Sequence, residues 1–390
     1  MAKKVCFISY DGMTDPLGQS QVLPYLKNLV AKGHTIHLIS FEKPERFEKF
    51  KADIDKICKE ANIVWHPKLY TKKPPILSTV KDIRVMTKTL TELHKIHPFD
   101  ILHARSYISM MAAFPFRNKG LKVLFDMRGF WADERIDGAI WNLKIPVFKW
   151  VYNFFKKKEK LWLENSDAIV SLTYAAADYI RLNFKISDTI QVIPCCTDEM
   201  VFKPSGNPIN QSDDLVYVGS LGTWYLLDEM LEFFSIWKEF YPRSKFRFIT
   251  LENKDFVLKS ASKFGLKAED FEIAPAQRHE VASRIEGAAA GIFFLKKSFS
   301  KMASSPVKQG EIMTMGLPIF CNTGVGDSSM IIKKYHSGIL IDEYTKNGYK
   351  LAIESYRQER FISDEIKAGA YEYFSLSQGV EKYHRLYESL

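Results

Sequence analysis

Short apolar runs alternate with helical patterns along both halves of the 390-residue chain. In the first half, the runs that predict buried strands lie at residues 5–9, 35–40, 101–104, 122–126, 168–172 and 190–193. In the second half, they lie at residues 215–218, 246–250, 271–274, 291–295, 318–321 and 338–341. Between strands, apolar residues recur on one helix face, as do Val22, Leu26, Leu29 and Val30. This alternation predicts an α/β protein with parallel sheets and right-handed crossovers.

A polar segment at residues 204–214 separates the two halves. It contains two prolines, one glycine and two asparagines, a composition typical of a linker. A chain of this length is also too long to fold around a single hydrophobic core. We therefore expect a Rossmann-like domain at residues 1–203 and a second one at residues 215–370.

Glycine-bearing turns follow the first strand of each half. Gly18 ends the first turn, and Gly219 and Gly222 lie in the second. Each turn joins a strand to a helix, where helix N-terminal amides and the helix dipole favour an anionic ligand. The glycines would let a phosphate or sugar approach the backbone closely, or they serve only as turn residues. Thr223 either contacts phosphate through its hydroxyl or caps a helix.

Charge and cysteine content narrow the setting. The formal net charge of +9 indicates an anionic partner, but the basic residues scatter without a nucleic-acid-binding module. Five cysteines without a C-x-x-C pair predict a reduced, cytoplasmic protein without a zinc site. No apolar signal-peptide core opens the sequence, and no stretch approaches the roughly 20 apolar residues of a membrane span.

One segment, residues 141–160, combines aromatic residues with a lysine cluster. Its lysines include Lys156, Lys157, Lys158 and Lys160. The segment is either a helix that lies on an anionic membrane surface, or a helix with its aromatics in the core and its lysines in water. Because Pro146 interrupts the pattern, we expect the helix to begin at about residue 147.

A series of motifs carries a resemblance over nearly the whole chain. After the opening strand and its turn come FDILHAR at residues 99–105 and DMRGFW at residues 126–131. The most specific segment is SSPVKQGEIMTMGLP at residues 304–318, and YHRLY follows at residues 383–387. In order and spacing, these motifs resemble the retaining nucleotide-sugar glycosyltransferases of the GT-B fold, family four.

The resemblance implies two Rossmann-like domains that face each other across a cleft, with a terminal helix at residues 371–390 that packs back on the first domain. It implies transfer of a hexose, with retention, from a UDP- or GDP-linked sugar to a saccharide or lipid-linked acceptor. Cell-surface polysaccharide or glycolipid synthesis is the expected setting. The donor would bind the second domain and the acceptor the first. No Asp-x-Asp motif ends a strand, so we expect no metal and no other cofactor.

The resemblance also implies residue roles. On the donor side, Glu311 would accept hydrogen bonds from ribose hydroxyls, and Lys308 would neutralise the departing phosphate. The remaining donor-site candidates are Gly18, Gly219, Gly222, Thr223, Ser304 and Ser305. On the acceptor side, the candidates are His103, Arg105 and Arg128. Arg128 stands where many relatives place a sugar-contacting histidine, and its alternative is a purely structural arginine. His103 either faces the ligand or is a core residue held by hydrogen bonds.

Two departures from the family pattern leave other functions open. Ala303 stands where relatives commonly carry a first glutamate, and Ser220 and Tyr225 fall near the usual arginine and lysine. The phosphate-neutralising role would then pass to Lys308, helped by Lys296, Lys297 or Arg278. The alternatives are a nucleotide-sugar epimerase of the same fold and a non-catalytic scaffold protein that has kept it.

Overall fold

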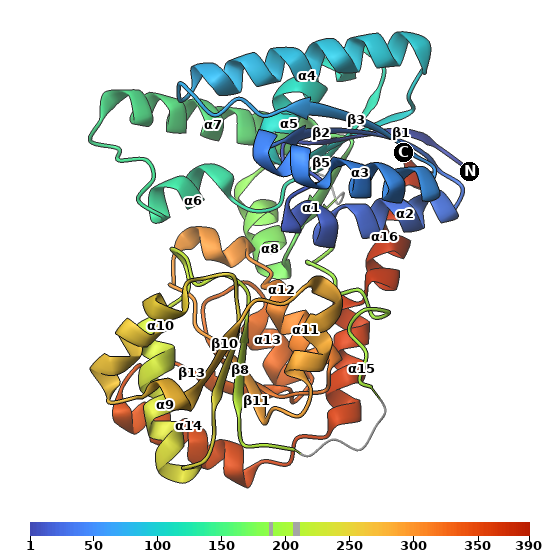
Figure 1. Cartoon of the computed structure of the whole chain (residues 1–390). Coiled ribbons are helices and arrows are strands. Elements are labelled where there is room, and N and C mark those ends of the chain that lie inside the picture. The colour runs from blue at the N-terminus through green and yellow to red at the C-terminus, as the bar shows by residue number, and fades with distance from the viewer. Residues whose placement is uncertain (187–189, 206–210) are drawn as a thin grey trace. The chain divides into compact units, whose positions relative to one another are not determined.

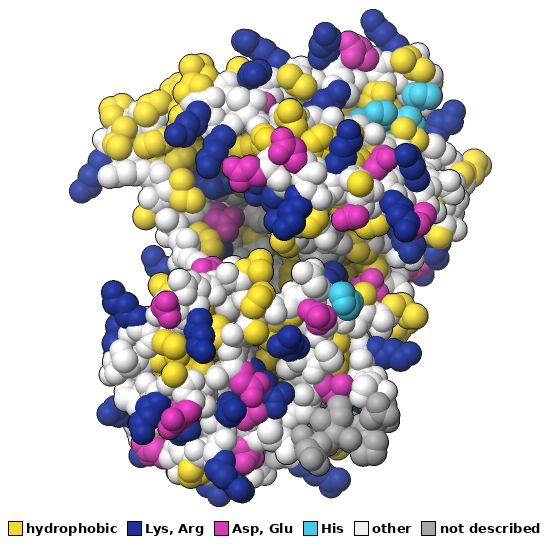
Figure 2. Space-filling model, in the orientation of Figure 1, with side chains coloured by type: hydrophobic (Ala, Val, Ile, Leu, Met, Phe, Trp, Pro, Cys, Tyr) yellow, Lys and Arg dark blue, Asp and Glu magenta, His cyan; other side chains and the backbone are white. Residues whose placement is uncertain are grey.

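The computed structural model describes residues 1–186, 190–205 and 211–390. Two compact units divide the chain (Figure 1): Met1–Pro194 with Leu376–Leu390, and Cys195–Ser375. Each unit holds one parallel sheet with helices around it. Charged side chains of both signs are interspersed on the visible face of each unit (Figure 2).

The first unit contains a seven-stranded parallel sheet in the order β3-β2-β1-β4-β5-β6-β7. Its strands are β1 (Lys4–Ser9), β2 (Thr35–Glu42), β3 (Ile63–Leu69), β4 (Ile101–Arg105), β5 (Lys122–Asp126), β6 (Ala168–Ser171) and β7 (Ile190–Val192). Its helices are α1 (Pro16–Gln21), α2 (Leu23–Ala31), α3 (Pro44–Glu60), α4 (Leu77–Ile96), α5 (Ser106–Ala113), the 3-10 helix η1 (Phe114–Lys119), α6 (Trp131–Asp137), α7 (Pro146–Asn165), α8 (Tyr174–Asn183) and α16 (Leu376–Ser389).

Strand order reverses beside β1, which pairs with β2 on one side and β4 on the other. In an open α/β sheet, such a switch point leaves a crevice at the carboxyl ends of the strands. The register aligns Ser9 with Arg105, and Arg105 with Asp126. Polar residues from three neighbouring strands therefore end at the same edge.

The second unit contains a six-stranded parallel sheet in the order β10-β9-β8-β11-β12-β13. Its strands are β8 (Leu215–Val218), β9 (Phe246–Ile249), β10 (Phe271–Ala274), β11 (Ala290–Phe293), β12 (Ile319–Asn322) and β13 (Gly338–Ile341). Its helices are α9 (Leu227–Phe240), α10 (Lys254–Ala261), α11 (Arg278–Ile285), α12 (Val307–Thr314), α13 (Ser328–Lys334), α14 (Lys346–Gln358) and α15 (Ser363–Phe374), with the 3-10 helices η2 (Ser262–Phe264), η3 (Ala268–Asp270) and η4 (Phe299–Ala303).

The switch point of the second sheet lies at β8, between β9 and β11. The glycine turn follows β8, and the start of α12 follows β11, so both lie at the carboxyl edge of the sheet. The apolar stripe of α9 (Met230, Leu231, Phe234 and Trp237) is fully buried in the core. This packing holds the turn and α12 against a rigid sheet.

The observed elements confirm the α/β fold but shift some boundaries. Helix α7 begins at Pro146, one residue earlier than expected, because proline at the first helical position has no amide hydrogen bond to lose. Contacts place residues 195–203 with the second unit and not the first: Thr197 N donates to Phe374 O at 2.7 Å. The middle of the expected linker, residues 206–210, lies outside the described residues. Strand β3, which contains a proline, had no counterpart among the expected strands.

Candidate functional site

Lys308 is buried between two tyrosine rings at the start of α12. Its Nζ lies 3.3 Å from the centroid of the Tyr225 ring and 4.3 Å from that of Tyr217. It also donates a hydrogen bond to the Tyr217 hydroxyl at 3.1 Å. Burial lowers the pKa of Lys308 well below its usual value, and the charge of Glu311 opposes this shift only in part. A nearby phosphate would favour the charged amine and so draw a proton onto it.

The glycine turn lies directly against this lysine. Gly219 adopts a φ of +108°, and a Cβ added there would lie 3.5 Å from Lys308 Nζ. The backbone conformation therefore favours glycine, while the lysine lies at ordinary contact distance. Lys308 thus places its amine beside the turn near which the family pattern has an arginine and a lysine.

Gly222 and Thr223 border open space. A Cβ at Gly222 would meet no described atom within 4 Å, so packing does not require a glycine at this position. Thr223 is exposed, and α9 begins only at Leu227, so Thr223 does not cap that helix. The capping alternative for Thr223 is therefore wrong for α9.

Glu311 forms an ion pair with Arg278, the first residue of α11, with 3.5 Å between the guanidinium Nη1 and the carboxylate. Only 7% of Glu311 is exposed. Burial raises the pKa of Glu311, while Arg278 and Lys308 counteract the shift. The Nη2 atom of Arg278 is buried and makes no hydrogen bond within the described part of the chain. One acid and two bases thus converge at the carboxyl edge of the second sheet.

Of the other site candidates around α12, some make hydrogen bonds within the protein and others are exposed. Ser305 Oγ accepts a hydrogen bond from Cys195 N at 3.1 Å, so it ties the start of α12 to the chain after β7. Ser304 is half-buried. Lys297 donates to Thr323 Oγ1 at 3.1 Å, and Lys296 is exposed. Of the three proposed helpers, only Arg278 contacts the Lys308–Glu311 pair.

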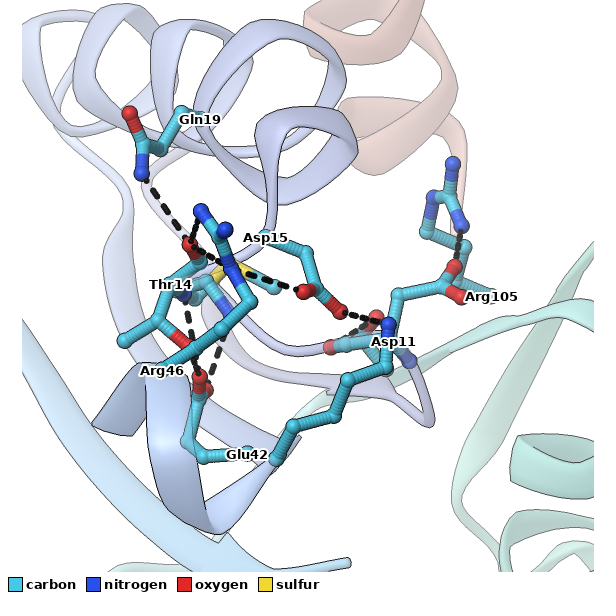
Figure 3. Close-up of polar contacts among 10 residues, drawn as sticks. Asp11, Thr14, Asp15, Gln19, Glu42, Arg46 and Arg105 are labelled. Atoms are coloured by element: carbon cyan, nitrogen blue, oxygen red, sulfur yellow. Dashed lines mark hydrogen bonds and ion pairs between the residues drawn. The ribbon is translucent and has the colours of Figure 1, made fainter. Parts of the chain in front are cut away.

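In the first unit, the glycine turn already holds a carboxylate. Glu42, at the end of β2, is fully buried. It accepts hydrogen bonds from Met13 N at 2.8 Å, Thr14 N at 3.0 Å and Thr14 Oγ1 at 2.6 Å (Figure 3). The hydroxyl of Ser40 donates to it at 2.5 Å. These two amides of the turn are therefore engaged by the protein itself and are not open to an anionic ligand.

The glycines of this turn explain how the carboxylate fits. A Cβ on Gly12 would lie 2.6 Å from Glu42 Oε2. A Cβ on Gly18 would lie 2.2 Å from Gly12 O. The structure thus gives Gly18 a packing role inside the turn, where its missing side chain makes room for backbone. Sequence reasoning missed Glu42, although a carboxylate at the end of an apolar strand was a usable signal.

His103 is a buried core residue. Its Nδ1 lies 2.6 Å from the Tyr387 hydroxyl, and its Nε2 lies 3.4 Å from Asp126 Oδ2. Tyr383 donates to the same carboxylate oxygen at 3.2 Å. Both tyrosines belong to α16, so this network attaches the terminal helix to the sheet. Burial lowers the pKa of His103, which holds the ring neutral. Both ring nitrogens of His103 thus have partners within the first unit, which favours the core-bonded alternative.

The two acceptor-side arginines lie at the strand ends. Arg105 pairs with Asp11, which belongs to the first glycine turn (Figure 3). Arg128 adopts a φ of +57°, which is uncommon for a residue with a side chain, and its Nη1 lies 3.7 Å from Asp126 Oδ1. Although burial works against the charged form, Arg128, His103 and Arg105 together hold the pKa of Asp126 below its usual value. The region is therefore a charged cluster at the switch point.

Comparison with known proteins identifies the family. Residues 19–200 match the model described as Glycosyltransferase Family 4. This segment of the chain is therefore a glycosyltransferase family 4 domain. The resemblance drawn from the sequence motifs is thereby confirmed, and the protein is a glycosyltransferase. No curated protein matches it in sequence.

Solved structures show the fold of the transferase. Sucrose-phosphate synthase from Thermosynechococcus elongatus is 12% identical with a TM-score of 0.74, over 99% of this chain and 98% of that one. HepE from Anabaena, in complex with UDP and glucose, is 12% identical with a TM-score of 0.70, over 100% of both chains. A putative UDP-N-acetylglucosamine 2-epimerase from Listeria monocytogenes is 13% identical with a TM-score of 0.60, over 98% and 94%. These likenesses confirm the GT-B fold.

Within residues 1–186, 190–205 and 211–390, no three His, Cys, Asp or Glu side chains gather as a metal site would require. Among the helices of those same ranges, none combines the length and the hydropathy needed to span a bilayer.

Proposed function

We propose that this transferase moves a hexose from a nucleoside diphosphate sugar to a saccharide or lipid-linked acceptor with retention of configuration. The donor would bind at the carboxyl edge of the second sheet, and the acceptor near the switch point of the first. The observation that carries the proposal is the meeting of Lys308, Glu311 and the Gly219 turn in one place. The UDP complex of HepE supports a uridine diphosphate donor.

Lys308 would stabilise the negative charge that develops on the leaving diphosphate. Its position between two rings holds the amine in one place, so little reorganisation is needed when charge develops. Glu311, with its pKa raised by burial, would receive the ribose hydroxyls beside Arg278. The leaving phosphate would itself take the proton of the acceptor hydroxyl on the same face of the sugar. The reaction would then need no metal and no protein base.

The acceptor-side role falls to Arg105 and Arg128, which lie at neighbouring strand ends. Their charges would orient an acceptor that bears hydroxyl or anionic groups. Synthesis of a cell-surface polysaccharide or glycolipid, on the cytoplasmic side of a membrane, is the setting in which such acceptors occur.

Ligand-dependent thermal unfolding tests the proposal directly. A ligand that binds only the native state raises stability by about 2.7 kcal/mol at a hundred times its dissociation constant. UDP, UDP-glucose, GDP and GDP-mannose should be compared at one concentration, and we expect a uridine nucleotide to give the largest rise. Release of free UDP that depends on an added acceptor would then show transfer. If no nucleotide raises the unfolding temperature, the donor site is misplaced.

The epimerase alternative is supported by the likeness to the Listeria protein, at a TM-score of 0.60. Incubation with donor alone separates the two reactions, since an epimerase changes the sugar without any acceptor. A scaffold protein would bind nucleotide without turnover on any acceptor, and Ala303 is the feature that favours it.

A further inference from the structure

Helix α7 of the first unit has two apolar faces. One face, with Val151, Phe155, Trp162 and Leu163, is buried in the core. The other carries Val147, Trp150, Phe154 and Leu161, which recur at spacings of three, four and seven residues and so share one side of the helix. Trp150 is 66% exposed and Val147 is 47% exposed. A helix that needs only one apolar face to fold therefore presents a second one to solvent.

The loop before α7 extends the same kind of surface. Ile140 is 52% exposed, Leu143 37% and Ile145 44%. Hydrophobic side chains gather over α7 in the space-filling view, with lysine and arginine side chains beside them (Figure 2). Contiguous exposed apolar surface of this kind marks an interaction site more often than a free surface.

Lysines surround this surface. Lys144, Lys149, Lys157 and Lys160 are exposed, and Lys158 lies 5.7 Å from the centroid of the Phe154 ring. Lys156 is different, because it pairs with Asp133 at 2.7 Å and with the buried Glu159. Its amine is part of the core network that attaches α7 to α6. The lysine cluster expected from the sequence is thus one structural lysine and several outward ones.

The carboxylates of the segment do not cancel this positive charge. Between residues 140 and 161 the only acidic residue is Glu159, which is fully buried. Asp133 also receives the Tyr152 hydroxyl at 2.8 Å, so it points into the same network. Lys160 lies 3.9 Å from Glu164, whereas no ion pair joins Lys144, Lys149 or Lys157 to a carboxylate of the described residues. The outward surface therefore combines apolar side chains with mostly unpaired lysines, which is the pattern of helices that lie in the interface of an anionic membrane.

We propose that this surface, named here the α7 surface (the outward residues 140–161), docks on an anionic lipid bilayer. Trp150, Val147 and the loop isoleucines enter the headgroup boundary, while the lysines meet lipid phosphates. Docking would bring the first unit to a lipid-linked acceptor. That benefit rests on the proposed function, but membrane binding itself does not, so the two can fail separately.

Vesicle co-sedimentation tests the proposal with the full chain. We expect binding to vesicles of phosphatidylcholine with 30% phosphatidylglycerol, in low salt, and little binding to phosphatidylcholine alone. Each lysine near an anionic surface contributes about fivefold in binding. The triple variant Lys144→Gln, Lys157→Gln, Lys158→Gln should therefore bind on the order of a hundredfold more weakly. Lys156 is left unchanged because its loss would disturb the core.

Two further variants separate docking from a general charge effect. Trp150→Ser removes an exposed side chain, so it should weaken vesicle binding at least tenfold without lowering the unfolding temperature. A matched control lies on α10 of the second unit, where Phe256 is 50% exposed beside the exposed Lys254 and Lys259. Changing these three to Ser, Gln and Gln should leave binding unaltered.

Several outcomes would overturn the proposal. The proposal fails if the wild-type protein does not sediment with anionic vesicles at low salt. It also fails if the wild-type protein and the α7 variants bind these vesicles equally. Self-association that Trp150→Ser abolishes, without vesicle binding, would make the α7 surface a contact between copies of the chain. Vesicle binding by a protein that lacks transferase activity would keep docking and reject only the proposed function.

Discussion

Replacing Lys308 by methionine should abolish activity and yet stabilise the protein. Lys308 is 5% exposed, and no carboxylate forms an ion pair with it among the described residues. Methionine fills a similar volume without a charge. The prediction follows from a conflict between burial, which disfavours the charged amine, and catalysis, which requires it.

The gain in the free energy of unfolding from Lys308→Met has an upper limit. The upper limit is the cost of an amine that is fully neutral at pH 7, about 3.5 units below the usual lysine pKa, which is about 5 kcal/mol. A charged amine would instead gain about 2 kcal/mol or more from a desolvated ring such as Tyr225. After these contacts are subtracted, we expect methionine to stabilise the second unit by about 1–3 kcal/mol. For a unit of this size, that gain in stability is a rise of about 2–12 °C in the unfolding temperature.

The stability that Lys308 contributes should change with pH, and the direction of its pKa shift gives the sign of this change. The pKa of Lys308 is lower in the folded chain than in the unfolded one. Between these two values only the unfolded chain binds the proton, so the stability contributed by this group rises with pH and levels off above about 10.5. The advantage of the methionine variant should therefore shrink as pH rises from 7 to 10.

Differential scanning fluorimetry across this pH range, with and without UDP, measures all three effects. UDP should stabilise wild type and give little or no shift in the variant, and transfer should fall on the order of a hundredfold or more. Lys296→Met, on an exposed lysine nearby, is the control and should change neither property. A Lys308→Met protein that unfolds earlier than wild type and keeps its UDP response would refute the reasoning.

Three further changes test other parts of the structure. Glu311→Ala should abolish most transfer without unfolding the chain, and Glu311→Gln should recover nucleotide binding in part; near-normal kinetics in the alanine variant would remove Glu311 from the site. Glu42→Ala should lower the free energy of unfolding in urea by about 3–5 kcal/mol, because several buried donors lose their acceptor and each costs about 1–3 kcal/mol. Asp53→Ala, on the exposed face of α3, should lie within about 0.5 kcal/mol of wild type; equal midpoints for the two variants would show that the turn does not need its carboxylate. Transfer should persist after exhaustive chelation, and activity that returns only with magnesium or manganese would reveal a metal at the phosphate site.

Much of this protein could be predicted from local patterns. Apolar runs separated by helical spacings determine parallel α/β units, since a strand buried on both faces must be apolar throughout. The segment at residues 304–318 pointed to Lys308 and Glu311 because both lie on one short helix, where their spacing alone brings them together. Proximity that arises within a few residues is visible in sequence.

Proximity between distant segments was decided only by the tertiary fold. Arg278 reaches Glu311 from another helix, and Glu42 reaches the first glycine turn from the end of the next strand. His103 is closed off by α16, almost 300 residues later in the chain. Lys156 points inward because it forms ion pairs with two buried carboxylates, those of Asp133 and Glu159. Burial of a charged group depends on where its partners lie in space, and the linear pattern of residues does not contain that information.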